Sequence, residues 1–568
     1  MIESIVTYLH LFGHNASVKN NRIITNHYYG TNKFVIAGDI TPLQIRELPI
    51  FYLIERSKYG SLAHVGWDNS SSENEGMICE GIRINRNIDY NNPNAVYKKA
   101  LENAVGTIID DLSNDEYNKK EIINEFSAHW KRTTPDEKHK VISFIEPGET
   151  IEEIIRYYPG SNSHHRYPFF IKGNAKQINE EYEYLKALMK NPQSKGQAIY
   201  IPFHFPLLPP NPTTIIMEWW FEILNKLSPN TQNHLKDFSR RNNTRDFWVL
   251  GSTKLIDGSH GWFSINFKNP NKLIPPLFKN ADTITWEAVA YDVCVHSKEY
   301  IIPRGGSTFY RTEKTIAIIG CGSVGAEIAR QIASSGINNL ILVDYDKLSI
   351  ENIYRHFLSS EYLGRSKSIE LSLELKKRYP YINATVIANY NLLSNCLTNY
   401  FLSNVDGIII ATGSPTEERY YNEELSKLDH KPWVIYCWVE GHGVGGHAIY
   451  VHNFGKGCLN CLYRDGDGNK SLESIQNFLK SEQKIAIDIA GCGTHFLPYS
   501  FTDAIQTAIL ATRLALLAVN NKLTESCRMS WKSDNSNEMS LETTYRYSTF
   551  KNSLGIEKLY WEYCDVCN

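Results

Sequence analysis

The stretch from residue 314 to residue 367 limits what this chain can fold into more than any other part of its sequence. A β-branched run at 315–319 is followed by the glycine motif GCGSVG at 320–325 and then by a helical pattern. A second apolar run at 340–343 ends at Asp344. A strand, a glycine turn, a helix, a strand and an acid in this order predict a nucleotide-binding βαβ unit.

The glycine motif and the acid have complementary roles in such a unit. Gly320, Gly322 and Gly325 let the backbone turn tightly and approach phosphate groups, whose negative charge faces the N-terminus of the helix. The carboxylate of Asp344 suits a ribose hydroxyl. Most units of this kind bind NAD or FAD, so an NAD-binding Rossmann protein is one interpretation of the chain.

The residues after Asp344 point to a different chemistry. The runs DYD at 344–346, SIENIYR at 349–355 and GRSK at 364–367 are not needed by a dehydrogenase. They resemble the ATP site of the ThiF/MoeB and ubiquitin-activating adenylyltransferases, which have D-x-D, S-x-x-N-x-x-R and G-x-x-K there. The resemblance implies a doubly wound, Rossmann-like α/β domain that uses ATP. It places Asp344 at the ribose and Asn352, Arg355 and Lys367 at the triphosphate.

The implied reaction needs positive charge and a metal ion. A carboxylate that attacks the α-phosphate builds up negative charge, which fixed arginine and lysine groups stabilise, so Arg355 and Lys367 are also candidate catalytic residues. The family usually has an Mg²⁺-binding aspartate after the strand that corresponds to 407–411, but this chain has TGSP at 412–415. The carboxylates near that point are Asp406, Glu417 and Glu418, and the sequence does not decide between them.

Two C-x-x-C pairs, Cys458 with Cys461 and Cys564 with Cys567, predict a zinc site. Thiolates are soft ligands, and two pairs supply the four that tetrahedral Zn²⁺ requires. The pairs are too far apart for a zinc ribbon, so they have to meet through the fold. A redox role is the alternative. ThiF/MoeB-like proteins have the same arrangement, which implies a structural zinc that fixes the C-terminus to the adenylation domain.

Cys492 lies in GCGTH at 491–495, ahead of a predicted helix that extends to about residue 517. The flanking glycines and the following helix N-terminus favour an exposed thiolate. In related activating enzymes, a cysteine at this point takes the acyl group from the adenylate, which makes Cys492 a candidate catalytic residue. A buried structural cysteine is the alternative, because sulfur-carrier relatives adenylate without an acyl-enzyme.

The first 140 residues resemble the ubiquitin-conjugating fold and, more narrowly, its bacterial relatives. Short strands are followed by His64-Val65, a polar loop, Cys79 and two amphipathic helices. The resemblance makes Cys79 the thioester cysteine and places His64 in its supporting loop. The family's oxyanion-stabilising asparagine is missing, because Gly66 and Trp67 follow, so the oxyanion role is unassigned. The predicted strands are 34–37 and 50–54, and the predicted helices are 95–112 and 118–130.

Length and composition indicate a globular protein of several domains. The 568 residues are enough for three or four domains, and a net charge of -3 offers no electrostatic case for nucleic acid or an anionic membrane. Gln506 and Arg513 interrupt the most apolar run, and the N-terminus lacks the positive charge of a signal peptide. We therefore expect a soluble cytoplasmic protein, whose 11 cysteines serve metal or thiol chemistry. The predicted domains are an α+β ubiquitin-conjugating-like domain at 1–140, a mixed α/β connecting domain at 141–310 and the adenylation domain at 311–568.

This domain order resembles the fused conjugating–activating enzymes of bacterial antiviral operons of the CBASS type. The resemblance implies that MgATP adenylates the C-terminal carboxylate of a partner protein, that Cys492 and then Cys79 carry the acyl group as a thioester, and that a target amine accepts it. It also implies a cGAS-like nucleotidyltransferase as the carboxylate donor, and a homodimer. A sulfur-carrier adenylyltransferase with a dispensable Cys79, or a scaffold that has lost activity, stays open.

Overall fold

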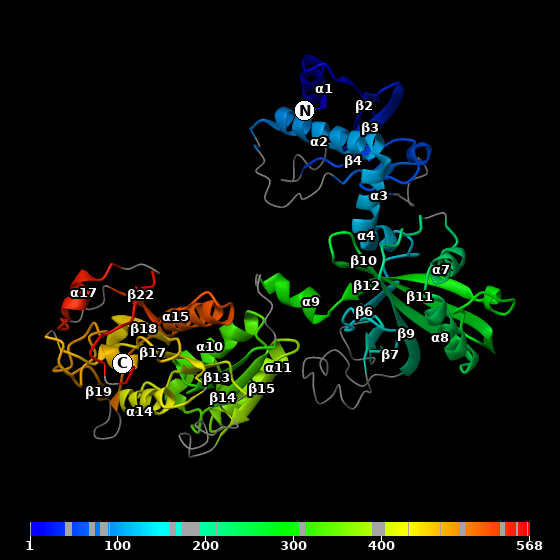
Figure 1. The fold of residues 1–568 in the computed structure, drawn as a ribbon. Helices are drawn as coiled ribbons and strands as arrows, with labels where there is room; N and C mark the ends of the chain where they lie inside the picture. Colours follow the sequence, from blue (N-terminus) through cyan, green and yellow to red (C-terminus); the bar gives the residue numbers. More distant parts are fainter. Residues whose placement is uncertain are drawn as a thin grey trace. The chain divides into compact units, whose positions relative to one another are not determined.

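The chain forms two compact units in a computed structural model (Figure 1). One unit comprises Met1–Asn174 and Leu188–Ser297, and the other comprises Ala175–Ala187 and Lys298–Asn568. The structure describes residues 2–39, 48–66, 74–79, 89, 91–159, 166–172, 194–211, 214–305, 313–388, 401, 404–429, 431–465, 467–488, 495–533, 540–551, 555–564 and 566–567.

The first unit begins with a five-stranded antiparallel sheet in the order β1-β2-β3-β4-β5. Ile5 and Leu9 of helix α1 and Leu101 of helix α2 pack against Ile36 and Leu53 of this sheet. The elements are α1 Ile2–Leu11, β1 Asn15–Lys19, β2 Arg22–Tyr29, β3 Asn32–Gly38, β4 Phe51–Leu53, a 3₁₀ turn at Arg56–Tyr59, β5 Gly76–Met77 and α2 Pro93–Ser113.

The single helix predicted at 118–130 is wrong, because the structure has two helices there, α3 at Asp115–Asn124 and α4 at Phe126–Lys131. The chain turns at Glu125, whose φ of -91° and ψ of 21° are not helical. With this break, Phe126 and Trp130 are both buried in the core of the following domain, and the Trp130 indole donates a hydrogen bond of 2.8 Å to the carbonyl of Tyr291.

The central part of the first unit is a closed barrel with the strand order β10-β11-β12-β6-β8-β7-β9. Because the barrel is closed, each of its strands pairs on both sides. The sequence pattern had indicated only mixed α/β structure for this part of the chain. Helices α7 and α8 pack onto it through Trp220, Leu235 and Phe238. The elements are β6 Lys140–Ser143, β7 Glu152–Tyr158, β8 Phe169–Ile171, β9 Ser194–Phe203, α7 Ile216–Asn225, α8 Pro229–Arg240, β10 Thr244–Lys254, β11 His260–Leu273, a 3₁₀ turn at Thr283–Thr285 and β12 Glu287–Val295.

The second unit contains an eight-stranded sheet in the order β15-β14-β13-β16-β17-β18-β21-β22. The first five strands are parallel and the last three are antiparallel. Helices α10, α11 and α15 cover one face and α14 packs on the other, which confirms the predicted doubly wound α/β domain. The strands are β13 Thr315–Ile319, β14 Asn339–Val343, β15 Asn383–Ile387, β16 Gly407–Ile410, β17 Trp433–Val439, β18 Gly445–Val451, β21 Cys527–Lys532 and β22 Glu557–Lys558, and a separate pair is β19 Ile487–Asp488 with β20 His495–Phe496.

The helices of the second unit complete its two layers. Helix α15 is long and apolar enough to cross a membrane by length and composition, although Gln506 and Arg513 interrupt it. Its residues Ala508, Leu510 and Leu514 are buried in the core of the unit, as in the core helix of a soluble fold. The helices are α9 Lys298–Ile301, α10 Ser323–Ser334, α11 Lys367–Arg378, α14 Pro415–Ser426, α15 Phe501–Val519 and α17 Tyr545–Thr549, with 3₁₀ turns at Ile302–Gly305, Ile350–Arg355, Ser360–Tyr362, Gly441–Gly443 and Leu459–Leu462.

The order of the parallel strands fixes where a ligand can bind. The chain runs outward from β13 to β14 and β15, and then returns to β16 on the other side of β13. The loops after β13 and β16 therefore diverge and leave a crevice at the carboxyl ends of these strands, the usual ligand site of open α/β sheets. The glycine motif follows β13 directly, so it lies at this crevice.

Candidate functional site

The glycine turn after β13 is built so closely that side chains cannot fit. Gly320 has a φ of +88°, and a β-carbon on it would lie 2.7 Å from the carbonyl oxygen of Ala411 at the end of β16. A β-carbon on Gly325 would lie 1.8 Å from the carbonyl oxygen of Gly320. Glycine is thus required at both positions, the first for its backbone conformation and both for space.

The Asp344 carboxylate connects the two strands at the crevice. Its Oδ2 accepts a hydrogen bond of 2.6 Å from the backbone N–H of Cys321, and its Oδ1 accepts one of 2.7 Å from the N–H of Asp346. Burial raises the pKa of Asp344, while these hydrogen bonds and Lys367 act in the opposite direction. The group is held in place at the end of β14, where a ribose hydroxyl could reach it.

The predicted phosphate-binding residues surround the same space. The Lys367 ammonium lies 2.9 Å from the Asp346 carboxylate, and Arg355 donates to the carbonyl of Leu497 at 3.1 Å while it stacks over the ring of Tyr499. Six of the seven residues predicted to bind the nucleotide line one cavity of about 210 Å³, and the seventh, Gly325, supports the turn behind it. These six are Gly320, Gly322, Asp344, Asn352, Arg355 and Lys367.

A larger cavity of about 600 Å³ adjoins the first and shares Gly322, Arg355 and Tyr499 with it. Its walls come from the carboxyl ends of β16 and β17 and from the segment that precedes β19. The residues that line this part include Thr412, Trp438, Glu440, Leu479, Lys480 and Leu497.

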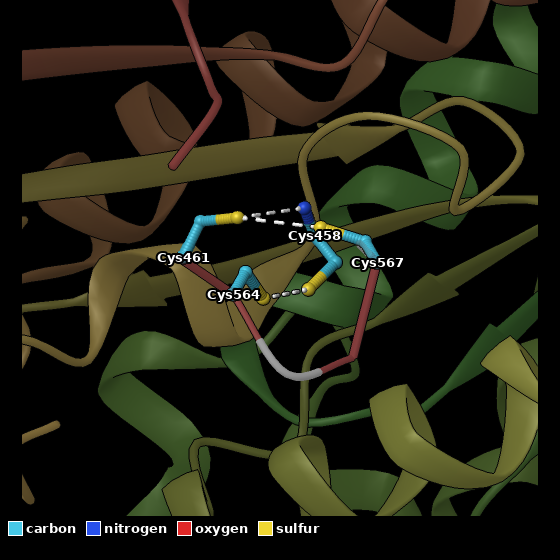
Figure 2. Close-up of side chains that lie close together, drawn as sticks. All are labelled: Cys458, Cys461, Cys564 and Cys567. Carbon is cyan, nitrogen blue, oxygen red and sulfur yellow. Dashed lines mark hydrogen bonds between the residues drawn. The ribbon is translucent and has the colours of Figure 1, made fainter. Parts of the chain in front are cut away.

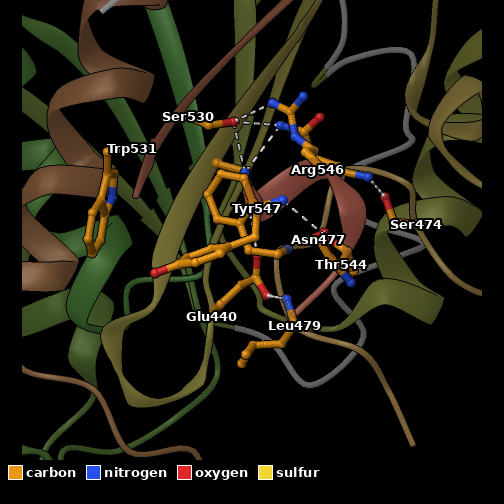
Figure 3. Close-up of polar contacts among 12 residues, drawn as sticks. Glu440, Ser474, Asn477, Leu479, Ser530, Trp531, Thr544, Arg546 and Tyr547 are labelled. Carbon is orange, nitrogen blue, oxygen red and sulfur yellow. Dashed lines mark hydrogen bonds and ion pairs between the residues drawn. The ribbon is translucent and has the colours of Figure 1, made fainter. Parts of the chain in front are cut away.

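Glu440 fixes one wall of the larger cavity through a buried polar network (Figure 3). Its carboxylate accepts hydrogen bonds of 2.5 and 2.8 Å from the N–H groups of Phe478 and Leu479, and one of 2.6 Å joins it to His447. Burial lowers the pKa of His447, against the effect of Glu440. Ser530 lies on the other side of this ring, 2.9 Å away, and Arg546 donates to Ser530 at 3.1 Å. The sequence analysis missed Glu440, since a lone acid after a strand carries no motif.

The structure separates the three carboxylates near the missing aspartate. Asp406 pairs with Lys314 at 2.6 Å at the amino end of β16, away from the crevice. Glu417 is exposed. Glu418 is only 3% exposed and lines the larger cavity, and its Oε1 accepts hydrogen bonds of 3.1 Å each from the hydroxyl of Thr412 and the N–H of Gly413. Burial raises the pKa of Glu418 to about 7.

The four cysteines of the two C-x-x-C pairs lie together (Figure 2). All four are buried, and their sulfur atoms lie within 4.8 Å of one another. The Sγ atoms of Cys458 and Cys564 are 3.5 Å apart, and those of Cys461 and Cys567 are 3.6 Å apart. Each pair thus faces the other across a space that a tetrahedral ion would fill, so the group is compatible with zinc.

Cys79 belongs to the first unit and Cys492 lies outside the described residues. Cys79 is half-buried, and its N–H donates a hydrogen bond of 2.7 Å to the carbonyl of His64. The Asp111 carboxylate lies 2.9 Å from Nδ1 of the His64 ring and raises the pKa of His64. The predicted supporting loop and the predicted cysteine are therefore in direct backbone contact.

The Glu418→Gln substitution tests the buried carboxyl group. Folded chain keeps the Glu418 proton up to about pH 7, whereas unfolded chain loses it near pH 4.5, so the wild-type carboxyl group makes folding less favourable as pH rises between these values. We expect the stability of Glu418→Gln relative to wild type to grow by about 3 kcal/mol over that window and then level off. Unfolding temperatures from pH 4.5 to 8 measure this difference. Glu417→Gln on the same helix controls for net charge, and a pH-independent difference for Glu418→Gln contradicts the assignment.

The sequence is similar to that of known adenylating and ubiquitin transferase-like proteins. Residues 310–547 match the ThiF family model. The chain is 23% identical over 541 residues to the ATP-dependent ubiquitin transferase-like protein Cap2 of Escherichia coli, which covers 86% of this chain and 87% of that protein. It is 28% identical over 176 residues to the adenylyltransferase and sulfurtransferase MOCS3 of Xenopus laevis, covering 30% of this chain and 38% of that protein.

Among solved structures, E. coli MccB with ATP is 17% identical and covers 45% of this chain and 67% of that chain, with a TM-score of 0.31. The family match coincides with the unit that holds the glycine turn, the Asp344 carboxylate and the two cavities. The similarity to Cap2 extends over most of both units. The C-terminal part of the chain, residues 310–547, is therefore a ThiF-family domain within a chain that is similar to Cap2 over most of its length.

Proposed function

We propose that this protein uses ATP to activate the C-terminal carboxylate of a partner protein and conjugates it to a target amine. The observation that carries the proposal is the cavity in which Asp344, Asn352, Arg355 and Lys367 meet the glycine turn, because a second cavity of about 600 Å³ adjoins it and offers space for the substrate carboxylate. The similarity to Cap2 over 86% of the chain supports a protein substrate and an acyl-transfer stage.

The adenylation step follows from the charges of the smaller cavity. Asp344 is the acceptor for the ribose hydroxyls, and Arg355 and Lys367 are the cations for the phosphates. An oxygen of the substrate carboxylate attacks the α-phosphorus, the new O–P bond forms, and the bond to the β-phosphate breaks to release pyrophosphate. Arg355 and Lys367 stabilise the charge that builds up on the phosphate oxygens.

Glu418 is the carboxylate that we propose for Mg²⁺ in place of the missing aspartate. It is the only one of the three candidates that lines the crevice, and a carboxylate oxygen is a donor that Mg²⁺ prefers. When bound, the ion neutralises phosphate charge. Thr412 and Gly413 hold one Glu418 oxygen, which orients the carboxylate.

The acyl group then moves from oxygen to sulfur. Cys492 displaces AMP and forms a thioester, Cys79 takes the acyl group by exchange, and a target amine finally forms the amide. We propose a cGAS-like nucleotidyltransferase as the carboxylate donor, a role in bacterial antiviral defence, a homodimeric assembly and a cytoplasmic location. A sulfur-carrier adenylyltransferase without conjugation is the second candidate, because the ThiF-type part also resembles MOCS3.

A thioester trap tests the conjugation stage. The protein is incubated with MgATP and the product of the neighbouring gene as candidate donor, and adducts are separated with and without reductant. We expect a reductant-sensitive adduct on wild type, none on Cys492→Ala, and on Cys79→Ala an adduct that is not passed on. An adenylate without any charged cysteine supports the sulfur-carrier function instead.

The Lys367→Gln substitution tests the smaller cavity. The variant loses a charged group at the phosphates, so we expect ATP affinity to fall tenfold or more, as measured by calorimetric titration. Lys427→Gln removes an exposed lysine that directly follows α14, outside both cavities, and is expected to leave the affinity unchanged. Equal affinities of wild type and Lys367→Gln would rule out the assigned role.

Metal analysis and chelation test the proposed structural zinc. We expect one zinc per chain and a lower unfolding temperature after chelation, because four buried thiol groups lose the ion that binds them together. Cys461→Ser should lower the zinc content, whereas Cys527→Ser, at another buried cysteine, should retain it. Full zinc content in Cys461→Ser would contradict the four-cysteine site.

A further inference from the structure

Arg132 carries a half-buried positive charge with no carboxylate at ion-pair distance within the described part of the chain. Its Nη1 makes two long contacts, 3.5 Å to the carbonyl of Val65 and 3.4 Å to Nδ1 of His129. Burial lowers the pKa of Arg132, and the charges of Glu125 and Cys79 oppose this effect. An incompletely paired, partly desolvated cation costs stability, so its position calls for a functional reason.

The partner behind Arg132 is a neutral ring and not an anion. His129 Nε2 lies 3.0 Å from the carbonyl of Ala63, so this nitrogen carries the proton and donates it. Burial lowers the pKa of His129 to about 4, which keeps the ring neutral at pH 7. The Nδ1 lone pair then accepts from Arg132, and the guanidinium keeps its full positive charge for another group.

The guanidinium lies beside the strand segment that pairs with Cys79. Val65 pairs with Ile78 in an antiparallel bridge, and the Cys79 N–H donates to His64. The Nε and Cζ atoms of Arg132 each lie 3.8 Å from the place that a β-carbon on Gly66 would occupy. The guanidinium therefore lies close to the backbone at Gly66, next to this pair of segments.

We propose that Arg132 stabilises the oxyanion that forms at Cys79, the role for which the sequence offers no asparagine. The proposal rests on the proposed function of Cys79 as an acyl carrier. When a thiolate or an amine adds to the thioester carbonyl, the C=O electron pair moves to oxygen. The intermediate then collapses, the old C–S bond breaks and the leaving thiolate departs, while an attacking amine loses its proton to solvent. A fixed cation favours the charge on oxygen.

A synthetic peptide α-thioester tests this role without the natural donor. The full chain with Cys492→Ala is mixed with the probe, and acyl transfer to Cys79 is followed by intact mass, with Cys79→Ala as the blank. We expect Arg132→Gln to slow acylation at least tenfold and Arg132→Lys to stay within threefold of the parent. Alkylation of Cys79 by iodoacetamide involves no oxyanion and should stay within twofold in every variant.

Lys131→Gln removes one exposed charge from the adjoining position and should change neither rate. The proposal is overturned if Arg132→Gln acylates at the parent rate, or if acylation and alkylation fall together, which would mean a general loss of access to the thiol. A different result is expected if the proposed function of Cys79 as an acyl carrier is wrong. ATP and donor would then never charge Cys79, although the effect of Arg132 on the synthetic thioester would persist.

Discussion

The hydrogen bonds that the Asp344 carboxylate accepts connect the parts of the proposed nucleotide site. Cys321 follows β13 and Asp344 follows β14, so the bond of 2.6 Å between them joins the carboxyl ends of two adjacent parallel strands. The second oxygen binds the N–H of Asp346, whose own carboxylate pairs with Lys367 at the start of α11. The glycine turn, the acid and the lysine are thus connected by one series of hydrogen bonds and an ion pair.

The sequence could predict that these residues lie together because the determinants of their placement are local. Glycines at a turn and an acid at a strand end directly determine the local backbone geometry and charge. The two C-x-x-C pairs together supply the four thiolates of a zinc site, so the sequence predicts that they lie side by side. The barrel could not be predicted from the sequence, because its closure depends on pairings such as β6 with β12, whose partners lie some 150 residues apart. The turn at Glu125 was missed because the burial of Trp130 in the barrel is a tertiary effect. Glu418 could be selected over Asp406 only once their strand ends were known.

One wall of the larger cavity is held in place by a buried carboxylate rather than by regular secondary structure. The segment that contains Phe478 and Leu479 has neither helix nor strand, so its N–H groups need acceptors from elsewhere. Glu440 supplies both oxygens, and His447 and Ser530 connect this carboxylate to Arg546 near the C-terminus. This wall of the larger cavity is therefore held by Glu440, which follows β17, and by residues of β18 and β21, which explains how an irregular segment can keep a defined shape.

Two of the proposed sites hold an ionisable side chain that no group of opposite charge pairs with among the described residues. Glu418 is a buried carboxyl group at the crevice with only neutral hydrogen-bond donors, and Arg132 is a half-buried guanidinium beside Cys79 with a neutral histidine behind it. The charged form of each group costs folding free energy, since a desolvated charge is stable only with a partner. For Glu418 this cost is the reason that burial raises the pKa to about 7. Under the proposed function, the substrate would supply the missing partner in both cases: a cation bound to the triphosphate for Glu418, and an oxyanion for Arg132. We therefore interpret the missing partners as preparation of both proposed sites for groups that arrive only with substrate.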